Sequence, residues 1–183
     1  MEELKNTSES PGEPETSYDY QCAKLSDIYT KLLERTVEVE IFTPPVMDLT
    51  KTYPLLILND GQDSEGVRLK KCLEELVLEK AIPEIIVVGV KAADRLQEYG
   101  VAFRSDFHGR GKQARAYSEY IIKELIPYIR YRYPISQEAE DRVMAGYSLG
   151  GLSAIDIVWN HPDQFGKVGV FRGSFWWRKR DSG

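Results

Sequence analysis

The feature that most constrains the fold is an alternation of short apolar runs, rich in β-branched residues, with longer amphipathic segments. The runs at 37–42, 53–58 and 85–90 have the length and composition of buried strands. Between the last two runs, apolar residues over 67–80 recur three and four positions apart, which is the spacing of a buried helix face. The residues expected on this face are Leu69, Cys72, Leu73, Leu76 and Val77. We therefore predict an α/β fold with a mostly parallel sheet and helices on both faces.

The same alternation continues into the second half of the chain. Apolar residues four positions apart over 117–129 predict a helix, and Pro127 should kink it. The runs 141–147 and 167–171 predict two further strands, with a helix over 149–159 between them. This order of strand, helix and strand is a further βαβ unit of the same predicted sheet.

Length and composition indicate one domain. The chain has 183 residues, of which 42% are hydrophobic, and this is enough for a single buried core. Residues 1–17 are rich in Glu, Ser, Pro and Thr, so we predict a disordered tail followed by a domain over 18–183. The segment 91–111 has no clear period and is predicted to be a functional loop over one edge of the sheet.

Charge and cysteine usage exclude several classes of protein. A net charge of −5 and a pI near 5.2 argue against nucleic-acid and membrane-surface partners. Cys22 and Cys72 do not have metal-ligand spacing, and we expect no metal and no cofactor. The N-terminus has no basic start followed by an apolar stretch, so a cytoplasmic location is expected, with secretion left open if a leader has been removed.

The segment around Ser148 carries the strongest chemical signal. Gly146, Ser148 and Gly150 form a G-x-S-x-G pattern at the predicted junction of a strand with a helix. Such a tight turn needs glycine on both sides because the strand and helix backbones nearly collide, and it lifts the hydroxyl above the sheet. We predict that Ser148 is a nucleophile on a strained turn; the alternative is a glycine-rich turn without catalysis.

A nucleophilic serine also requires donors for the oxyanion of a tetrahedral intermediate. The N–H of Leu149 lies in the first turn of the predicted helix, where it has no intrahelical acceptor. A second donor is expected from the loop 60–62, because Gly61 lets the backbone approach closely. Without the neighbouring serine turn, this Asp-Gly pair would be an ordinary turn.

Several motifs in a fixed order resemble one family. They are Tyr-Pro-Leu-Leu-Ile-Leu-Asn-Asp-Gly-Gln at 53–62, Arg-Leu-Gln-Glu-Tyr-Gly at 95–100, Gly-Arg-Gly at 109–111, Glu-Leu-Ile-Pro-Tyr-Ile at 124–129, Ala-Gly-Tyr-Ser-Leu-Gly-Gly at 145–151, His-Pro-Asp-Gln-Phe-Gly at 161–166 and Gly-Ser-Phe-Trp-Trp at 173–177. Over about residues 35 to 178, this set resembles the esterase family of esterase D and enterochelin esterase, which have the α/β-hydrolase fold.

The resemblance implies roles for particular residues. Ser148 would be the nucleophile, and the backbone amides of Gln62 and Leu149 would form the oxyanion hole. Residues expected at the substrate pocket are Asp60, Arg95, Glu98 and Tyr147. The chain also departs from the family, because Arg172 stands where the family usually has Ser, which changes the expected shape of the pocket.

The end of the chain is the larger departure. In α/β-hydrolases the acid and the histidine follow the serine, and His161 is the sole histidine after Ser148. A helix should carry His161 about 15 to 20 Å from Ser148, so we expect a structural histidine there. His108 is expected to be a loop residue. We expect the acid, the base and the last strands of the sheet to lie beyond Gly183.

We therefore predict a serine carboxylic-ester hydrolase that acts on a small-molecule ester through an acyl-enzyme intermediate, with weak or no activity in this chain. The alternatives are a non-catalytic binding protein on the same fold and a related acyltransferase. The strand at 167–171 should lie at an exposed edge of the sheet. Such an edge would either self-associate or be covered by a later segment of the chain, and we favour the cover.

Overall fold

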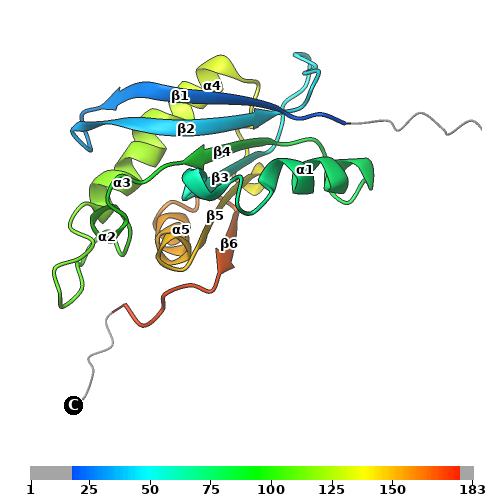
Figure 1. Ribbon diagram of the computed structural model, residues 1–183. Helices are drawn as coiled ribbons and strands as arrows, with labels where there is room; N and C mark the ends of the chain where they lie inside the picture. Colours follow the sequence, from blue (N-terminus) through cyan, green and yellow to red (C-terminus); the bar gives the residue numbers. More distant parts are fainter. Residues whose placement is uncertain (1–17, 178–183) are drawn as a thin grey trace, which may run out of the picture.

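The computed structural model describes residues 18–177 (Figure 1). Its strands are β1 (Gln21–Thr30), β2 (Arg35–Thr43), β3 (Leu55–Asn59), β4 (Ile86–Val90), β5 (Arg142–Tyr147) and β6 (Lys167–Phe171). Its helices are α1 (Leu69–Leu78), α2 (Arg95–Glu98), α3 (Ala114–Tyr120), α4 (Ile126–Arg132) and α5 (Leu149–Asn160), with short 3-10 turns η1 (Gly61–Asp63) and η3 (Ala139–Asp141) and a π-helical turn η2 (Ile121–Leu125). The predicted tail over 1–17 lies outside the described residues.

The strands form one mixed sheet in the order β1-β2-β4-β3-β5-β6. β4, β3, β5 and β6 are parallel to one another, while β2 is antiparallel to both β1 and β4. The mostly parallel sheet and the α/β fold predicted from the sequence are confirmed. Each strand expected from the sequence is present, with ends shifted by at most about two residues, as assignment of element ends normally allows.

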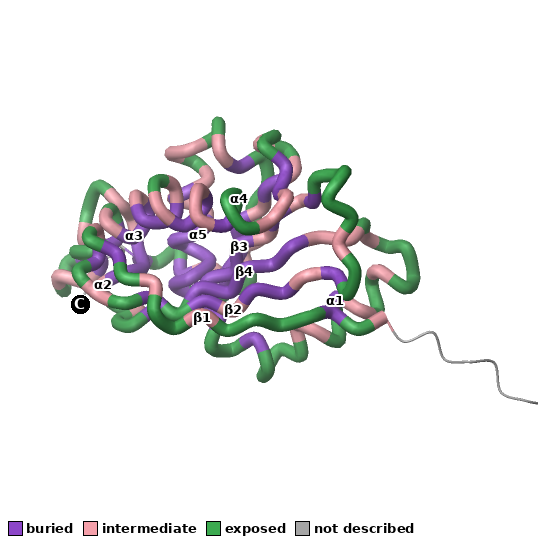
Figure 2. Tube along the Cα trace, turned by 90° about the horizontal axis from the view of Figure 1, so that it is seen from above, coloured by how far each residue is buried: buried purple, intermediate pink, exposed green. Residues whose placement is uncertain are grey.

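The first strand, β1, was not predicted from the sequence. Most of its residues are exposed, and its pairing with β2 shifts register between Leu25 and Ile28. Figure 2 shows the contrast between this exposed outer strand and the buried central strands. An edge strand with few buried side chains lacks the continuous apolar run by which the central strands are recognised.

The core lies on both faces of the sheet. In β4, Ile86 and Val88 belong to one buried cluster, while Val87 between them belongs to another, because successive side chains point to opposite faces. The first cluster includes residues from α3, η2, α4 and α5, and the second includes Leu73 of α1. Helices therefore cover both faces, as predicted.

The helix predicted over 67–80 is present as α1, but its buried face is narrower than expected. Leu73 is buried and Leu69 and Val77 pack around it, four positions apart. Cys72 and Leu76, which the spacing also placed inward, are exposed. The expectation that they are buried is wrong, because α1 meets the sheet along a single row of side chains.

Pro127 has a clear structural consequence. It lies in the first turn of α4, directly after the π-helical turn η2. Proline has no N–H and clashes with the carbonyl four residues before it, so an α-helix cannot pass through this position undisturbed. The wider turn accommodates the proline, and the chain continues as a helix beyond the irregularity that the sequence predicts.

Two kinds of feature are absent from residues 18–177. No helix between residues 18 and 177 combines the length and the apolar character that crossing a bilayer requires. The same residues contain no group of three or more His, Cys, Asp or Glu side chains arranged to hold a metal ion.

Candidate active site

Ser148 occupies the turn between β5 and α5. Its φ of 52° and ψ of −117° lie in a region that L residues rarely adopt, which confirms the predicted strained turn. A Cβ atom on Gly146 would lie 2.5 Å from the main-chain carbon of Gly150. Gly146 is therefore required by the crossing of strand and helix, whereas a Cβ on Gly150 would lie 2.9 Å from Oδ2 of Asp60.

Strand β6 and the segment after it hold the backbone of Ser148 by two hydrogen bonds. The N–H of Ser148 donates to the carbonyl of Phe171 at 2.9 Å, and the carbonyl of Ser148 accepts from the N–H of Ser174 at 3.1 Å. The Ser148 and Ser174 hydroxyl oxygens are 3.0 Å apart. Ser148 is exposed, so its hydroxyl can be reached from outside the protein. The sequence did not identify Ser174 as a neighbour of Ser148.

The two expected oxyanion donors lie on the segments that follow β3 and β5. Leu149 begins α5, where the first turn leaves N–H groups free of intrahelical acceptors. In the loop after β3, the N–H groups of Asp63 and Ser64 donate to the carbonyls of Asp60 and Gly61. These turn hydrogen bonds do not use the N–H of Gln62. Asp60 before it has a left-handed backbone with φ of 62°. The two loops lie at the carboxyl ends of adjacent parallel strands.

Asp60 lies at the centre of a polar cluster. Arg95 contacts it with two guanidinium nitrogens, Nε at 2.6 Å from Oδ1 and an Nη at 2.9 Å from Oδ2. The side-chain amide of Gln62 donates to Oδ1 at 3.0 Å. The hydrogen bond to Asp60 raises the pKa of Arg95 above its ordinary value, so this cation keeps its proton. The structure thus brings together three of the residues expected from the sequence.

Glu98 is placed differently from the other expected pocket residues. Its carboxylate is buried and accepts two hydrogen bonds from Arg35 of β2, each at 2.7 Å. The N–H of Ala93 donates to the same carboxylate at 3.3 Å. These contacts tie α2 to the antiparallel part of the sheet and do not join Glu98 to the cluster around Asp60.

Tyr147 lies at the end of β5 beside a shallow hollow. Its ring stacks on that of Phe171, with ring centroids 4.8 Å apart. The hollow is lined by Tyr147, Val170, Phe171 and Arg172. Arg172 has a positive φ of 51° and no carboxylate partner within residues 18–177. The residue that departs from the family pattern therefore lines the wall of a hollow adjoining Ser148.

A buried amide that the sequence did not single out lies behind the turn. Asn59, the last residue of β3, donates from Nδ2 to the carbonyl of Gly150 at 2.8 Å. Its Oδ1 accepts from the hydroxyl of Tyr117 at 2.7 Å. In the sequence, Asn59 is only the polar residue that ends an apolar run, and no local pattern links it to α5.

Neither histidine of the chain is hydrogen-bonded to Ser148. His161 ends α5, and its Nε2 lies 3.2 Å from the hydroxyl of Ser118 on α3. His108 lies in the loop before α3, where its N–H donates to Asp106. The expected structural position of His161 at the end of the helix is confirmed.

The segment after β6 returns to the loop between α2 and α3 (Figure 1). The Trp177 ring is buried there against Gly100 and Gly111, and a Cβ at Gly100 would meet it at 2.6 Å. The Arg110 guanidinium lies over the Trp176 and Trp177 rings, 5.4 and 5.5 Å from their centroids. The predicted functional loop is therefore anchored to the segment that also contacts Ser148.

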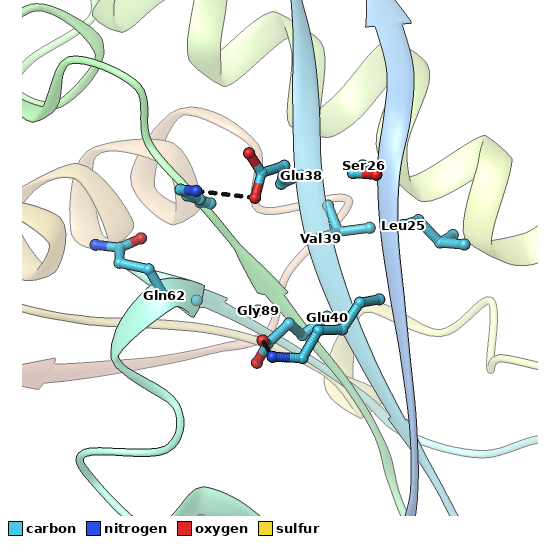
Figure 3. A pocket seen from close by; sticks show the side chains of 10 residues that line it. Leu25, Ser26, Glu38, Val39, Glu40, Gln62 and Gly89 are labelled. Atoms are coloured by element: carbon cyan, nitrogen blue, oxygen red, sulfur yellow. Dashed lines mark hydrogen bonds and ion pairs between the residues drawn. The ribbon is translucent and has the colours of Figure 1, made fainter.

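A second hollow of about 240 Å³ has Gln62 among its lining residues (Figure 3). It extends over β1, β2 and β4, and Gly61 and Gly89 are among its lining residues. Two ion pairs bound it, Lys24 with Glu40 at 2.7 Å and Lys91 with Glu38 at 2.8 Å. Its cations are thus each neutralised by a neighbouring carboxylate.

The chain is similar to a known family and to several known proteins. Residues 30–183 match the model of the family described as "Putative esterase". Among curated proteins, the chain is 28% identical to the uncharacterized protein YbbA of Bacillus subtilis over 129 residues, which are 68% of this chain and 51% of that protein. It is 30% identical to the iron(III) enterobactin esterase of Escherichia coli K12 over 151 residues, which are 81% of this chain and 35% of that protein.

A solved structure shares the fold. The enterobactin esterase of Shigella flexneri, determined in the presence of enterobactin, superposes with a TM-score of 0.71 at 26% identity. The match covers 89% of this chain and 39% of the esterase. The chain spans about half the length of the Bacillus relative that it matches.

Proposed function

The chain belongs to the esterase family whose model it matches over residues 30–183, and we propose that it is a serine carboxylic-ester hydrolase. The observation that carries the proposal is the backbone of Ser148, with a φ of 52° on the turn between β5 and α5. A strained, exposed serine at the start of a helix is the arrangement of a nucleophile elbow. Glycine would adopt this backbone conformation without strain, so the turn itself gives no structural reason for a serine at position 148.

The proposed reaction uses the residues already described. The Ser148 oxygen attacks the carbonyl carbon of the ester, and its proton passes to solvent water, because neither histidine is hydrogen-bonded to this hydroxyl. The N–H groups of Leu149 and Gln62 donate to the resulting oxyanion, which is stabilised further by the dipole of α5. The alcohol then leaves with a proton, and water hydrolyses the acyl-serine by the same two steps. No metal or cofactor takes part in these steps.

We propose that turnover by the 183-residue chain is slow. Neither histidine is hydrogen-bonded to the Ser148 hydroxyl, whose side-chain partner within residues 18–177 is the hydroxyl of Ser174. A positioned general base contributes about 10²- to 10⁴-fold to such reactions. Without one, the oxyanion donors alone would support only a small rate above background.

The substrate that we propose is a small-molecule ester. The enterobactin esterases among the relatives of the chain support this class. The same lack of a histidine beside Ser148 favours, as a second candidate, a binding protein that retains the fold without catalysis. The two candidates differ in whether the Ser148 hydroxyl reacts.

Covalent labelling tests the nucleophile directly. Because no base assists the hydroxyl, we expect a fluorophosphonate to modify the chain slowly, once, at Ser148, and the Ser148→Ala variant to remain unlabelled. Hydrolysis of 4-nitrophenyl acetate should be only slightly faster than with Ser148→Ala, because no base assists the hydroxyl. Peptide mass spectrometry locates the label, and absorbance measures the hydrolysis.

The matched control is Ser153→Ala, which removes another serine hydroxyl from α5, at a buried position. This variant should be labelled as fast as the wild type. A label at another residue, or none after prolonged exposure, would reject the hydrolase in favour of the binding protein. Rapid hydrolysis abolished by Ser148→Ala would show that a base is present after all.

A further inference from the structure

A buried hydrogen-bonded path joins the two segments that carry the proposed oxyanion donors. At its centre, the Asn59 amide binds the carbonyl of Gly150 in the first turn of α5 at 2.8 Å and the hydroxyl of Tyr117 at 2.7 Å. All three residues are buried. Asn59 directly precedes the loop that contains Gln62. The side chain of Asn59 therefore contacts the first turn of α5, while its backbone continues into the loop 60–62.

The loop itself is held by a second group of contacts on the same path. The N–H of Asp60 donates to the hydroxyl of Tyr99 at 2.9 Å, and the carboxylate of Asp60 is held by Arg95. The ring of Tyr99 packs edge-on against that of Tyr117, with centroids 5.3 Å apart. The path from α5 through Asn59 and Tyr117 therefore continues to the loop through packed rings.

The Gly150 carbonyl fixes the direction of these hydrogen bonds, because a carbonyl oxygen can only accept and therefore faces the Nδ2 group of Asn59. Oδ1 of Asn59 then faces the hydroxyl of Tyr117, which donates to it. Burial raises the pKa of Tyr117 well above its ordinary value, so this hydroxyl keeps the proton that it donates. A buried polar group left without its partner costs about 1 to 3 kcal/mol, so this arrangement resists rotation of the amide.

We propose that Asn59 is a positioning residue that holds the first turn of α5 and the loop 60–62 in one fixed relation. In that relation the N–H groups of Leu149 and Gln62 converge on a single oxyanion. The proposal rests on the proposed function, because it assigns Asn59 a part in the same reaction. Displacement of a catalytic group by about 1 Å can cost about 10²-fold in rate, so a residue that touches no substrate can still affect turnover strongly.

A pair of tyrosines on α3 provides the first test. Tyr117→Phe removes the hydroxyl that donates to Asn59, whereas Tyr120→Phe removes a buried hydroxyl with no hydrogen-bond partner within the described residues. For fluorophosphonate labelling of Ser148, we expect Tyr117→Phe to lower the maximal rate about tenfold and to leave the half-saturating concentration unchanged. Tyr120→Phe should change neither quantity.

Two asparagines that contact α5 provide the second test. Asn59→Asp removes the donor to Gly150, and Asn160→Asp removes a similar donor to the carbonyl of Asp156, 2.7 Å away at the other end of the helix. We expect Asn59→Asp to slow labelling more than Tyr117→Phe does, and Asn160→Asp to leave it unchanged. A loss of affinity rather than of maximal rate, or equal slowing by both asparagine variants, would reject positioning and indicate a general structural role.

Hydrogen exchange tests the coupling without any reaction at Ser148. The N–H of Leu152 is bonded to the carbonyl of Ser148, and that of Ser64 to the carbonyl of Gly61, so these amides report on the two segments separately. In Asn59→Asp both should lose protection together, relative to the amides of β4. If only one does, Asn59 does not couple the segments and the proposal is wrong. An unlabelled wild type would instead reject the proposed function, leaving the coupling to be judged by exchange alone.

Discussion

Gly61 shows how a single missing side chain shapes the candidate site. A Cβ atom at this position would lie 2.4 Å from the main-chain carbon of Gly89 on β4. Both contacting groups are backbone, so neither can move aside without disturbing the sheet. The loop that carries Gln62 can therefore take its course only with glycine here.

We predict that Gly61→Ala lowers the free energy of unfolding by about 3 kcal/mol, because the added carbon forces strand and loop apart. Denaturant unfolding monitored by fluorescence measures the change. The control is Gly66→Ala in the same connection, where the nearest neighbour of a Cβ atom would be the carbonyl of Asp63 at 3.4 Å. Equal stability of the two variants would show that the close approach to β4 is not a constraint.

The residues of the site differ in how far the sequence could predict them. Ser148 and its glycines were predictable because a short local pattern encodes the turn, and the structure confirms the strained backbone. Asn59 and Ser174 were not, because their contacts join residues 91 and 26 positions apart. Such contacts depend on strand order, which no local pattern specifies.

At the scale of elements, α5 links the candidate site to the loop between α2 and α3. Asp156 in this helix accepts a hydrogen bond at 2.9 Å from the N–H of Ala102 in that loop. Burial raises the pKa of Asp156, and the bonds from Ala102 and Asn160 offset part of this effect. The folded protein therefore binds a proton at Asp156 more tightly than the unfolded chain does.

The sign of the resulting pH dependence follows from linkage. A carboxyl group whose pKa is raised on folding opposes folding once pH exceeds its unfolded pKa of about 3.9, and the full penalty is reached above the folded pKa. We predict that Asp156→Asn raises the melting temperature at neutral pH and that the gain disappears in acid. Thermal melts across a pH series measure this difference.

Asp163→Asn should behave in the opposite way. The side-chain hydrogen bond from Gln164 lowers the pKa of Asp163, so ionisation of this exposed carboxylate favours the folded state slightly. Its replacement should give no gain in melting temperature at neutral pH. A gain with Asp163→Asn, or a gain with Asp156→Asn that persists in acid, would contradict the assignment of the burial effect to Asp156.

The elements themselves were largely predictable where they pack on both sides. Continuous apolar runs identified β3 and β4, and helical spacing identified α5. The outer strand β1 was missed, and at Pro127 the sequence predicted a kink but not its form, the π-helical turn η2. β1 buries too few side chains to leave a pattern, and η2 arises from one proline within an otherwise helical sequence.

For the whole molecule, β6 forms one edge of the sheet within the described residues. Apolar side chains gather beside it, from the outer face of α5 to the strand itself. They include Ile155, Val158, Trp159, Pro162, Phe165 and Val168, which line one hollow. Trp159 is 83% exposed and Val168 38%, so a large apolar area faces solvent next to unpaired backbone groups.

This surface leads to the last prediction, that the 183-residue chain, tested without any later segment to cover it, self-associates through the β6 edge. An unpaired strand beside exposed apolar side chains is a template for a second strand, and burial of the apolar area would contribute about 25 cal/mol per Å². Sedimentation velocity over a concentration series should show a monomer–dimer equilibrium that Trp159→Lys shifts toward monomer, because a buried lysine would oppose the contact. Tyr131→Lys is the matched control, since Tyr131 is a similarly exposed aromatic, 90% exposed, but lies on α4 and outside this hollow. A wild type that stays monomeric throughout, or a dimer weakened equally by both lysines, would show that the β6 edge is not where copies of the chain meet.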